Sequence, residues 1–254
     1  MSVTERSRLE LAVRSDGDLK LIPYLMAGYP SRAASISHGR AYADAGVSAI
    51  EVGIPHSDPL ADGPVIQRAG QAALEGGMTV SGALEVAAAI ADRGTPVVLM
   101  TCVNPLLAYG PTRFAVECAS SGVAGVIVPD LPAEESDPVA DPLRASGVDT
   151  IFLFAPTSPD SRMHSIAERS SGFVYCVTLA GVTGVRDDLP PRLEELLARA
   201  RQATELPIVT GFGISQPEHL RRLRGKADAA AVGSALVARE NPVELVEELL
   251  RACR

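Results

Sequence analysis

The sequence has little of the chemistry on which metal and redox proteins depend. Its 254 residues include four cysteines, four histidines and no tryptophan. The cysteines form no C-x-x-C motif, and the histidines form no H-E-x-x-H pattern. Both absences argue against a zinc enzyme or a thiol-redox enzyme. We therefore expect reduced cysteines and no metal site.

The chain also lacks an excess of basic residues and a long apolar segment. It has 23 Lys and Arg against 31 Asp and Glu, a formal net charge of −8. Proteins that bind nucleic acids or anionic membranes need clustered Lys and Arg. The longest apolar run, residues 229–238, is too short to cross a membrane. The charged N-terminal segment does not have the apolar region of a signal peptide. We expect a cytoplasmic protein that binds neither nucleic acid nor membrane.

The sequence does contain a regular alternation of apolar runs and amphipathic stretches. Most of the runs are continuously apolar, as parallel strands covered on both faces are. The pattern predicts a single (β/α)8 TIM barrel over residues 1–254. An open, doubly wound sheet is the alternative, because alternation alone does not show closure. The predicted strands are Leu19–Ala27, Ser48–Ile54, Pro96–Thr101, Ala124–Pro129, Thr150–Ala155, Phe173–Thr178, Pro207–Gly211 and Ala229–Gly233. The clearest helical stretches are Arg32–Ala45, Val80–Asp92, Thr112–Ser121, Pro159–Ser170 and Pro191–Ala203.

A single carboxylate interrupts the second predicted strand. Side chains alternate along a strand, so Glu51 shares a face with the small residues Ala49 and Gly53, while the bulky residues face the other way. Inside a barrel, these small neighbours leave room around the carboxylate. An ion pair with a Lys or Arg of another strand is the structural alternative, although the predicted strands hold hardly any positive charge. A carboxyl buried without a cation has a raised pKa, so Glu51 is a candidate proton donor near neutral pH.

The loop after this strand carries a second candidate, Asp62. Residues 55–64, PHSDPLADGP, are mostly turn formers. Asp62 is either a catalytic group or the N-cap of a helix that starts at Pro64. His56, in the same loop, is predicted to be solvated.

Three glycine clusters follow the last three predicted strands. They are GVTG at 181–184, GFGIS at 211–215 and VGSA at 232–235. Glycine lets the backbone approach a ligand closely, and Ser234 is placed to cap a helix whose free N–H groups face the ligand. The loops after the seventh and eighth strands are the usual phosphate site of such barrels. The set predicts a phosphorylated small-molecule ligand.

In combination, these segments resemble the α subunit of tryptophan synthase. The resemblance is most specific over residues 50–64, IEVGIPHSDPLADGP, and extends in order over nearly the whole chain. It implies a lyase that cleaves indole-3-glycerol phosphate into indole and glyceraldehyde 3-phosphate without a cofactor in this subunit. It also implies a β subunit that carries pyridoxal phosphate and receives the indole within an α2β2 tetramer. The other matching segments are YLMAGYP at 24–30, NP at 104–105, VPDLP at 128–132, APTSP at 155–159, GFVY at 172–175 and AGVTG at 180–184, besides GFGIS and VGSA.

The resemblance also implies residue roles. Glu51 resembles the family's general acid and base, which protonates carbon 3 of the indole and takes a proton from a glycerol hydroxyl. Asp62 resembles the carboxylate that stabilises the positively charged indole nitrogen. Tyr175 lines the same site and is the third implied catalytic residue, and Thr183 contacts Asp62 when its loop closes. The remaining implied substrate-binding residues are Tyr24, Met100 and Ile127 around the indole, Gly184, Gly213, Gly233 and Ser234 around the phosphate, and Gly211 and Phe212 elsewhere in the site.

Three residues depart from the family's usual pattern. Cys102 stands where many relatives have tyrosine, His56 replaces a frequent Phe or Tyr, and Tyr24 stands where some members have Phe. The first two lie near the predicted active-site end of the barrel.

Two other functions remain open. One is a different phosphate-binding barrel enzyme, such as a sugar-phosphate isomerase or an indole-glycerol-phosphate synthase; the Glu51 and Asp62 pair argues against it. The other is a non-catalytic subunit that binds a phosphorylated ligand and activates a partner. The presence of Glu51, Asp62 and Thr183 together argues against this second function.

Overall fold

The strands form one parallel sheet that closes on itself. The computed structural model describes residues 6–59, 62–177, 192–211 and 213–254. Among these residues, nine strand segments are hydrogen-bonded in the order β5-β4-β3-β2-β1-β9-β8-β7-β6. The terminal segments β5 and β6 are consecutive in the chain and are separated by Phe152 alone. They therefore act as one strand, which pairs with β4 on one side and β7 on the other. The prediction of a (β/α)8 barrel is confirmed, and the open sheet is wrong.

Each observed strand overlaps one of the predicted apolar runs. The observed strands are somewhat shorter than the runs, because the residues at the run ends leave the ladder and enter loops. The strands are β1 Lys20–Met26, β2 Ile50–Gly53, β3 Val97–Met100, β4 Val123–Ile127, β5 Asp149–Ile151, β6 Leu153–Phe154, β7 Val174–Cys176, β8 Ile208–Thr210 and β9 Ala229–Val232.

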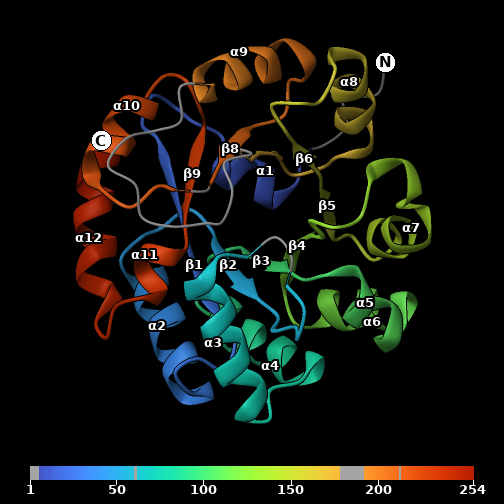
Figure 1. The fold of residues 1–254 in the computed structure, drawn as a ribbon, viewed down its shortest axis with the longest axis vertical. Helices are drawn as coiled ribbons and strands as arrows, with labels where there is room; N and C mark the ends of the chain where they lie inside the picture. The colour runs from blue at the N-terminus through green and yellow to red at the C-terminus, as the bar shows by residue number, and fades with distance from the viewer. Residues whose placement is uncertain (1–5, 60–61, 178–191, 212) are drawn as a thin grey trace.

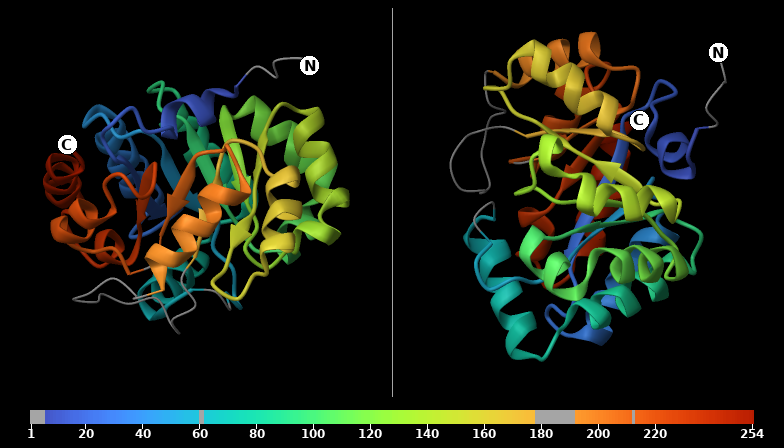
Figure 2. Two further views of the ribbon diagram at one scale, coloured as in Figure 1. Left: turned by 90° about the horizontal axis from the view of Figure 1, so that it is seen from above. Right: turned by 90° about the vertical axis from the view of Figure 1, so that its right-hand side faces the viewer.

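Helices surround the strands, as Figure 1 shows in a view close to the barrel axis and Figure 2 shows from two further sides. Several begin at proline, which suits the first helical turn because its N–H has no intrahelical partner there. The helices are α1 Arg8–Val13, α2 Arg32–Asp44, α3 Pro64–Glu75, α4 Val80–Ala91, α5 Val103–Tyr109, α6 Pro111–Ser120, α7 Asp137–Ala145, α8 Asp160–Arg169, α9 Leu193–Ala203, α10 Pro217–Leu223, α11 Ser234–Val237, α12 Pro242–Cys253 and the 3-10 turn Ala133–Glu135.

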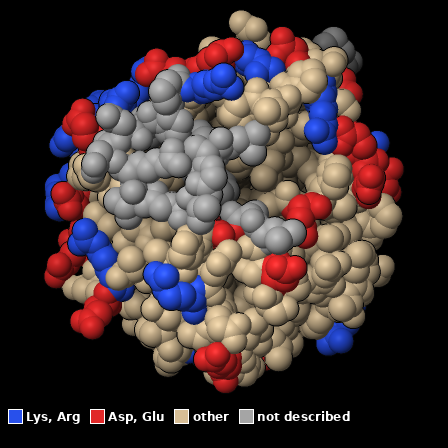
Figure 3. Space-filling model, in the orientation of Figure 1, with Lys and Arg blue, Asp and Glu red and all other residues tan. Residues whose placement is uncertain are grey.

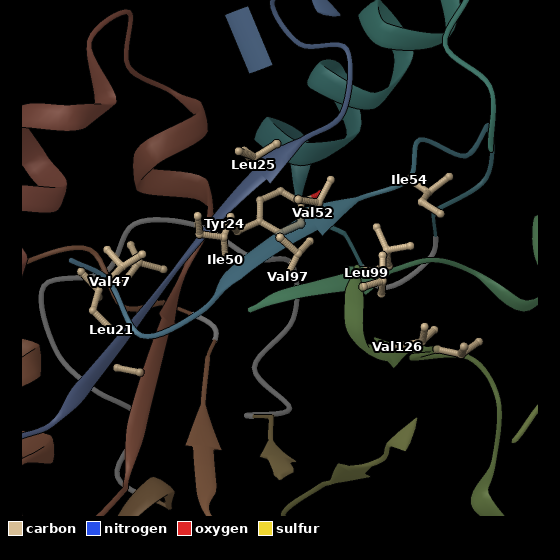
Figure 4. Close-up of a cluster of buried hydrophobic side chains, with 14 of the residues drawn as sticks. Leu21, Tyr24, Leu25, Val47, Ile50, Val52, Ile54, Val97, Leu99 and Val126 are labelled. Carbon is tan, nitrogen blue, oxygen red and sulfur yellow. The ribbon is translucent and has the colours of Figure 1, made fainter. Parts of the chain in front are cut away.

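The side chains of β2 divide between the two faces of the sheet as alternation predicts. Ile50, Val52 and Ile54 belong to the larger apolar cluster, which lies between the strands and the helices (Figure 4). Ala49 belongs to the second cluster, inside the barrel. Glu51 shares the inner face with Ala49, so the sheet points a carboxyl group into the barrel.

The short helix α1 packs against the interior of the barrel. Leu9 and Val13 are fully buried and belong to the inner cluster. Ser7, the N-cap of α1, donates a hydrogen bond from Oγ to Asp149 Oδ2 at the start of β5. Asp149 opens its strand, so α1 covers the N-terminal end of the barrel and leaves the C-terminal end for a site. This helix lies outside the helical stretches predicted from the sequence.

No single helix among the described residues is long and apolar enough to cross a membrane. Helices α3 and α4 pass that test only as a pair, and the pair is bent by 107°.

Candidate active site

A cavity lies at the C-terminal ends of the strands. Its wall includes side chains from β1, β2, β3 and β7 and from the segments that follow β8 and β9. The predicted site residues that line it are Tyr24, Glu51, Asp62, Met100, Tyr175, Gly213, Gly233 and Ser234. The structure therefore brings together most of the predicted residues that it describes, although they come from six strands or their loops.

Two predicted residues lie elsewhere. Ile127 is completely buried in the inner cluster of the barrel and does not line the cavity. Gly211 is also buried and lies behind the ring of Tyr175. The predicted residues Thr183, Gly184 and Phe212 lie outside the described residues.

Five residues of the cavity wall were not predicted individually, although three of them, Ile214, Ser215 and Ala235, lie in the predicted glycine clusters. Ala231 lies on the inner face of β9, where alternation with Gly233 places it, so the strand pattern held a signal for it. The other four lie in loops or at helix starts, where no periodicity distinguishes a cavity residue from a solvated one. The missed residues are Ile66, Ile214, Ser215, Ala231 and Ala235.

Glu51 is buried in the cavity wall without a cation. Its side chain is 3% exposed, and it forms no ion pair with any Lys or Arg in the described part of the chain. The predicted alternative of an interstrand ion pair is therefore wrong for these residues. Burial, and secondarily the negative charge of Asp62, raises the pKa of Glu51 to about 8. At pH 7 the carboxyl group is mostly protonated and can donate a proton.

Asp62 faces the same cavity and does not cap a helix. The N-cap of α3 is Gly63, and no side chain makes a hydrogen bond at that cap. The N-cap alternative for Asp62 is therefore wrong. Partial burial raises the pKa of Asp62 to about 6, so this group is mostly ionised at pH 7. At neutral pH the two carboxyl groups therefore differ in protonation: Glu51 is mostly protonated and Asp62 is mostly ionised.

Two buried tyrosines flank Glu51. Tyr24 is directly opposite Glu51 in the ladder between β1 and β2. Burial, and then the charges of Asp62 and Glu51, holds the pKa of Tyr24 well above 10. Burial and the charge of Glu51 do the same for the pKa of Tyr175. Both phenols are neutral at physiological pH, so each presents a polar O–H group at the end of an apolar ring.

Each tyrosine ring occupies space that only glycine leaves open. A Cβ atom on Gly53 would lie 2.0 Å from Tyr24 Oη, and one on Gly211 would lie 2.1 Å from Tyr175 Oη. Both contacts are far below van der Waals distance. Gly211 therefore acts in this structure by admitting the Tyr175 ring, a role that the glycine-cluster pattern does not predict.

The opposite part of the cavity wall consists of small residues and main chain. Gly213 has a φ of +84°, a conformation that favours glycine. Gly233 is the N-cap of α11 and no side chain makes a hydrogen bond at that cap, so the prediction that Ser234 caps this helix is wrong. None of the described residues that line the cavity is Lys or Arg. Among the described residues, the groups that could hold an anion in this part of the cavity are N–H and O–H donors.

A smaller cavity adjoins the first and shares Tyr24, Asp62 and Met100 with it. All three departures from the family pattern, Tyr24, His56 and Cys102, line it. His56, predicted to be solvated, is half-buried there. Burial, together with the nearby aspartates, raises the pKa of Cys102 to about 12, so the side chain is a thiol and not a thiolate. Figure 3 shows acidic side chains beside the central hollow of this face.

The part of the chain that the structure describes holds no group of three or more His, Cys, Asp or Glu side chains that could bind a metal ion. The titratable groups of the cavity are carboxyl and phenol groups, whose chemistry is proton transfer and charge stabilisation.

Comparisons with known proteins agree on one family. A family model described as tryptophan synthase alpha chain matches residues 11–249. A tryptophan synthase alpha chain of Chloroflexus aurantiacus is 45% identical over 229 residues, 89% of this chain and 86% of that one. A tryptophan synthase alpha chain of Synechocystis is 44% identical over 248 residues, 96% and 94% of the two chains. A solved Mycobacterium tuberculosis tryptophan synthase superposes with a TM-score of 0.92 at 37% identity, covering 98% of this chain and 99% of that one.

Proposed function

Because this chain belongs to the tryptophan synthase alpha chain family, we propose that its cavity cleaves indole-3-glycerol phosphate into indole and glyceraldehyde 3-phosphate, with Glu51 and Asp62 as the catalytic groups. The chain is a carbon–carbon lyase of tryptophan biosynthesis. One observation carries the assignment of the catalytic pair. Two carboxyl groups face one cavity, and their surroundings give them different protonation states at pH 7.

Glu51 moves both protons of the reaction. In its protonated form it donates a proton to carbon 3 of the indole, which converts the ring into a leaving group. The resulting carboxylate then takes the proton of the glycerol hydroxyl next to the scissile bond. As that O–H becomes a C=O, the electron pair of the carbon–carbon bond returns to the indole ring. Glu51 ends protonated, ready for the next turnover.

Asp62 stabilises the charge that this sequence creates. Protonation at carbon 3 leaves a positive charge that is shared with the indole nitrogen. A carboxylate that is already ionised and fixed in the cavity wall stabilises this charge without reorganising. Because Asp62 is half-buried, its charge is screened by water less than that of an exposed carboxylate.

The remaining cavity residues bind the substrate. Tyr24, Met100 and Tyr175 supply the wall around the indole, and Ile127 supports it from the barrel core. Main-chain N–H groups of Gly213, Gly233 and Ser234, together with Gly184, hold the phosphate. Each hydrogen bond to a charged group contributes about 1.5–3 kcal/mol, so three or four of them replace a Lys or Arg. Phe212 and Thr183 complete the site.

Membership of this family also implies a partner subunit. An alpha chain of tryptophan synthase works with a β subunit. We propose that the two form an α2β2 tetramer in the cytoplasm and that pyridoxal phosphate belongs to the β subunit. Indole is apolar and uncharged, and passes to that subunit for condensation with serine. This chain needs no cofactor for its own half of the reaction, because Glu51 carries both proton transfers in the proposed sequence.

Indole release from indole-3-glycerol phosphate tests the proposal. The purified chain is assayed alone and with a tryptophan synthase β subunit, as wild type, Glu51→Gln and Glu168→Gln. Glu168 is an exposed carboxylate on α8 and serves as the control. We expect the Glu51 variant to lose at least 10²-fold in rate, as loss of a general acid–base group typically does, and the control to match wild type. A wild-type chain that releases no indole under either condition would disprove the activity. Near-normal release by the Glu51 variant would remove Glu51 from the mechanism.

A further inference from the structure

One polar side chain of the cavity wall has no partner and no role in the reaction above. Ser215 follows β8, in the same loop as Gly213, and lines the cavity. Its side chain is 8% exposed. Its Oγ has no hydrogen-bond partner among the described residues. Buried hydroxyl groups are nearly always paired, so this one calls for an explanation.

Other buried serines of the chain show the usual arrangement. Ser35 Oγ donates to Arg32 O at 2.9 Å and accepts the N–H of Gly28 at 3.2 Å. Ser136 Oγ donates to Ala133 O at 2.7 Å. In these places the hydroxyl stabilises a turn or a helix end. Ser215 differs, because its hydroxyl oxygen is buried without a hydrogen-bond partner among the described residues, although the residue lines the cavity.

The main-chain N–H of Ser215 already makes a hydrogen bond within the protein. Its N–H donates to Nδ1 of His219, one turn into the following segment, at 3.3 Å. His219 lies on α10 and is 1% exposed, so the ring is fixed by packing. The ring therefore anchors the loop and leaves the hydroxyl as the one donor that Ser215 can offer to a ligand.

We propose that Ser215 donates its hydroxyl to a phosphate oxygen of the substrate and that His219 is the residue that positions it. This inference rests on the proposed function, which supplies the phosphate. A phosphate dianion offers only acceptors, and the cavity wall in the described residues contains no Lys or Arg to meet them. A hydroxyl two residues after Gly213 and in the same cavity as Ser234 adds a donor where charge must be balanced by hydrogen bonds.

The proposal predicts opposite effects on the free and the bound protein. Without ligand, the unpaired hydroxyl contributes nothing to folding and is desolvated at a cost. Ser215→Ala therefore leaves the Tm of the free protein unchanged or raises it. With ligand, the variant lacks one charge-assisted hydrogen bond, so it binds phosphate ligands more weakly. A serine that only supports the loop would lower the free Tm when replaced.

The experiment compares Ser215→Ala with wild type in the full-length chain. The ligand probes are sn-glycerol 3-phosphate and indole, with Kd measured by calorimetry and Tm by circular dichroism. We expect Kd for glycerol 3-phosphate to rise about tenfold, and Kd for indole to stay within twofold. In turnover of indole-3-glycerol phosphate, KM rises and kcat stays within twofold, since the contact is equal in ground state and transition state. The matched control Ser35→Ala lowers the Tm and leaves both Kd values unchanged.

Two results would overturn the assignment of Ser215. One is an unchanged Kd for glycerol 3-phosphate in Ser215→Ala, which would mean that water or another group satisfies the hydroxyl. The other is a lower free Tm with equal losses for glycerol 3-phosphate and indole, which would mean a structural role. Neither result depends on turnover. Failure of the wild type to cleave indole-3-glycerol phosphate would instead disprove the proposed function, and the glycerol 3-phosphate titration would still decide the role of Ser215.

A double-mutant cycle tests His219. If the ring acts only through Ser215, His219→Phe raises the glycerol 3-phosphate Kd in the wild-type background and changes it less than twofold in Ser215→Ala. If the increase in Kd in the double variant equals the product of the increases in the two single variants, the two residues act independently, and His219 does not position Ser215. Should His219→Phe fail to fold, His219→Gln retains an acceptor for the N–H of Ser215 and is expected to bind glycerol 3-phosphate within threefold of wild type. A larger loss would also contradict it.

Discussion

The burial of Glu51 without a cation makes the fold less stable than it would be with a neutral side chain. Glu51→Gln keeps the shape and the hydrogen-bonding atoms of the carboxylic acid but cannot ionise. We therefore expect this variant to be more stable than wild type at neutral and basic pH, and to have lost its lyase activity. One substitution would thus move stability and activity in opposite directions.

The magnitude follows from the pKa of Glu51 in the two states. The pKa is about 8 in the folded chain, against 4.5 for the ordinary side chain in the unfolded chain. Between these values the folded state holds one proton more than the unfolded state. Wild-type stability therefore falls by about 1.4 kcal/mol per pH unit as the pH rises, and the fall ends near pH 8. The loss reaches about 3 kcal/mol at pH 7 and about 4 kcal/mol at pH 8.

Urea unfolding at pH 5, 6, 7 and 8 measures this loss. Far-UV circular dichroism is the suitable probe, because the chain has no tryptophan for fluorescence. The quantity of interest is the difference in unfolding free energy between Glu51→Gln and wild type, since groups common to both proteins cancel. We expect the difference to be below about 1 kcal/mol at pH 5 and to grow toward the values above. Glu168→Gln, at an exposed position, should show no such growth.

A difference that does not change with pH would refute the reasoning, because it would mean that Glu51 does not titrate between 4.5 and 8 in the folded chain. A variant that is less stable than wild type at pH 8 would mean that the carboxylate has a stabilising partner. Added stability with undiminished indole release would keep the electrostatic argument and remove Glu51 from the catalysis.

The strands were predictable from sequence because both faces of a parallel barrel are covered. Their runs are therefore apolar throughout, and Glu51 stands out in one of them. Closure was not predictable, because it depends on how the ends of the sheet meet. Here they meet through β5 and β6, two ladder segments on either side of Phe152, and neither is long enough to show a period.

Local sequence patterns were least informative where the role of a side chain depends on which of two adjacent residues begins a helix. Asp62 and Gly63 are both acceptable N-caps in front of Pro64, and the structure uses Gly63. The side chain of Asp62 is thereby released to the cavity. In the same way, α1 has six residues, too few for a helical period, so the burial of Leu9 and Val13 was not visible in the sequence.

Three further changes test the surroundings of the catalytic pair. Gly53→Ala should lower substrate affinity, because its Cβ would lie 2.0 Å from Tyr24 Oη; substrate titration checks this, and normal affinity would mean that the ring moves freely. Cys102 keeps its proton to about pH 12, so iodoacetamide at pH 8 should modify it far more slowly in the folded than in the urea-unfolded chain. Asp62→Asn removes the negative charge that adds to the raised pKa of Glu51, so the basic limb of the kcat/KM profile should move to lower pH while indole release falls. Because burial is the larger cause, that limb should still lie above the ordinary glutamate pKa of 4.5. If the basic limb of Asp62→Asn lies at the same pH as that of wild type, the charge of Asp62 does not affect the pKa of Glu51.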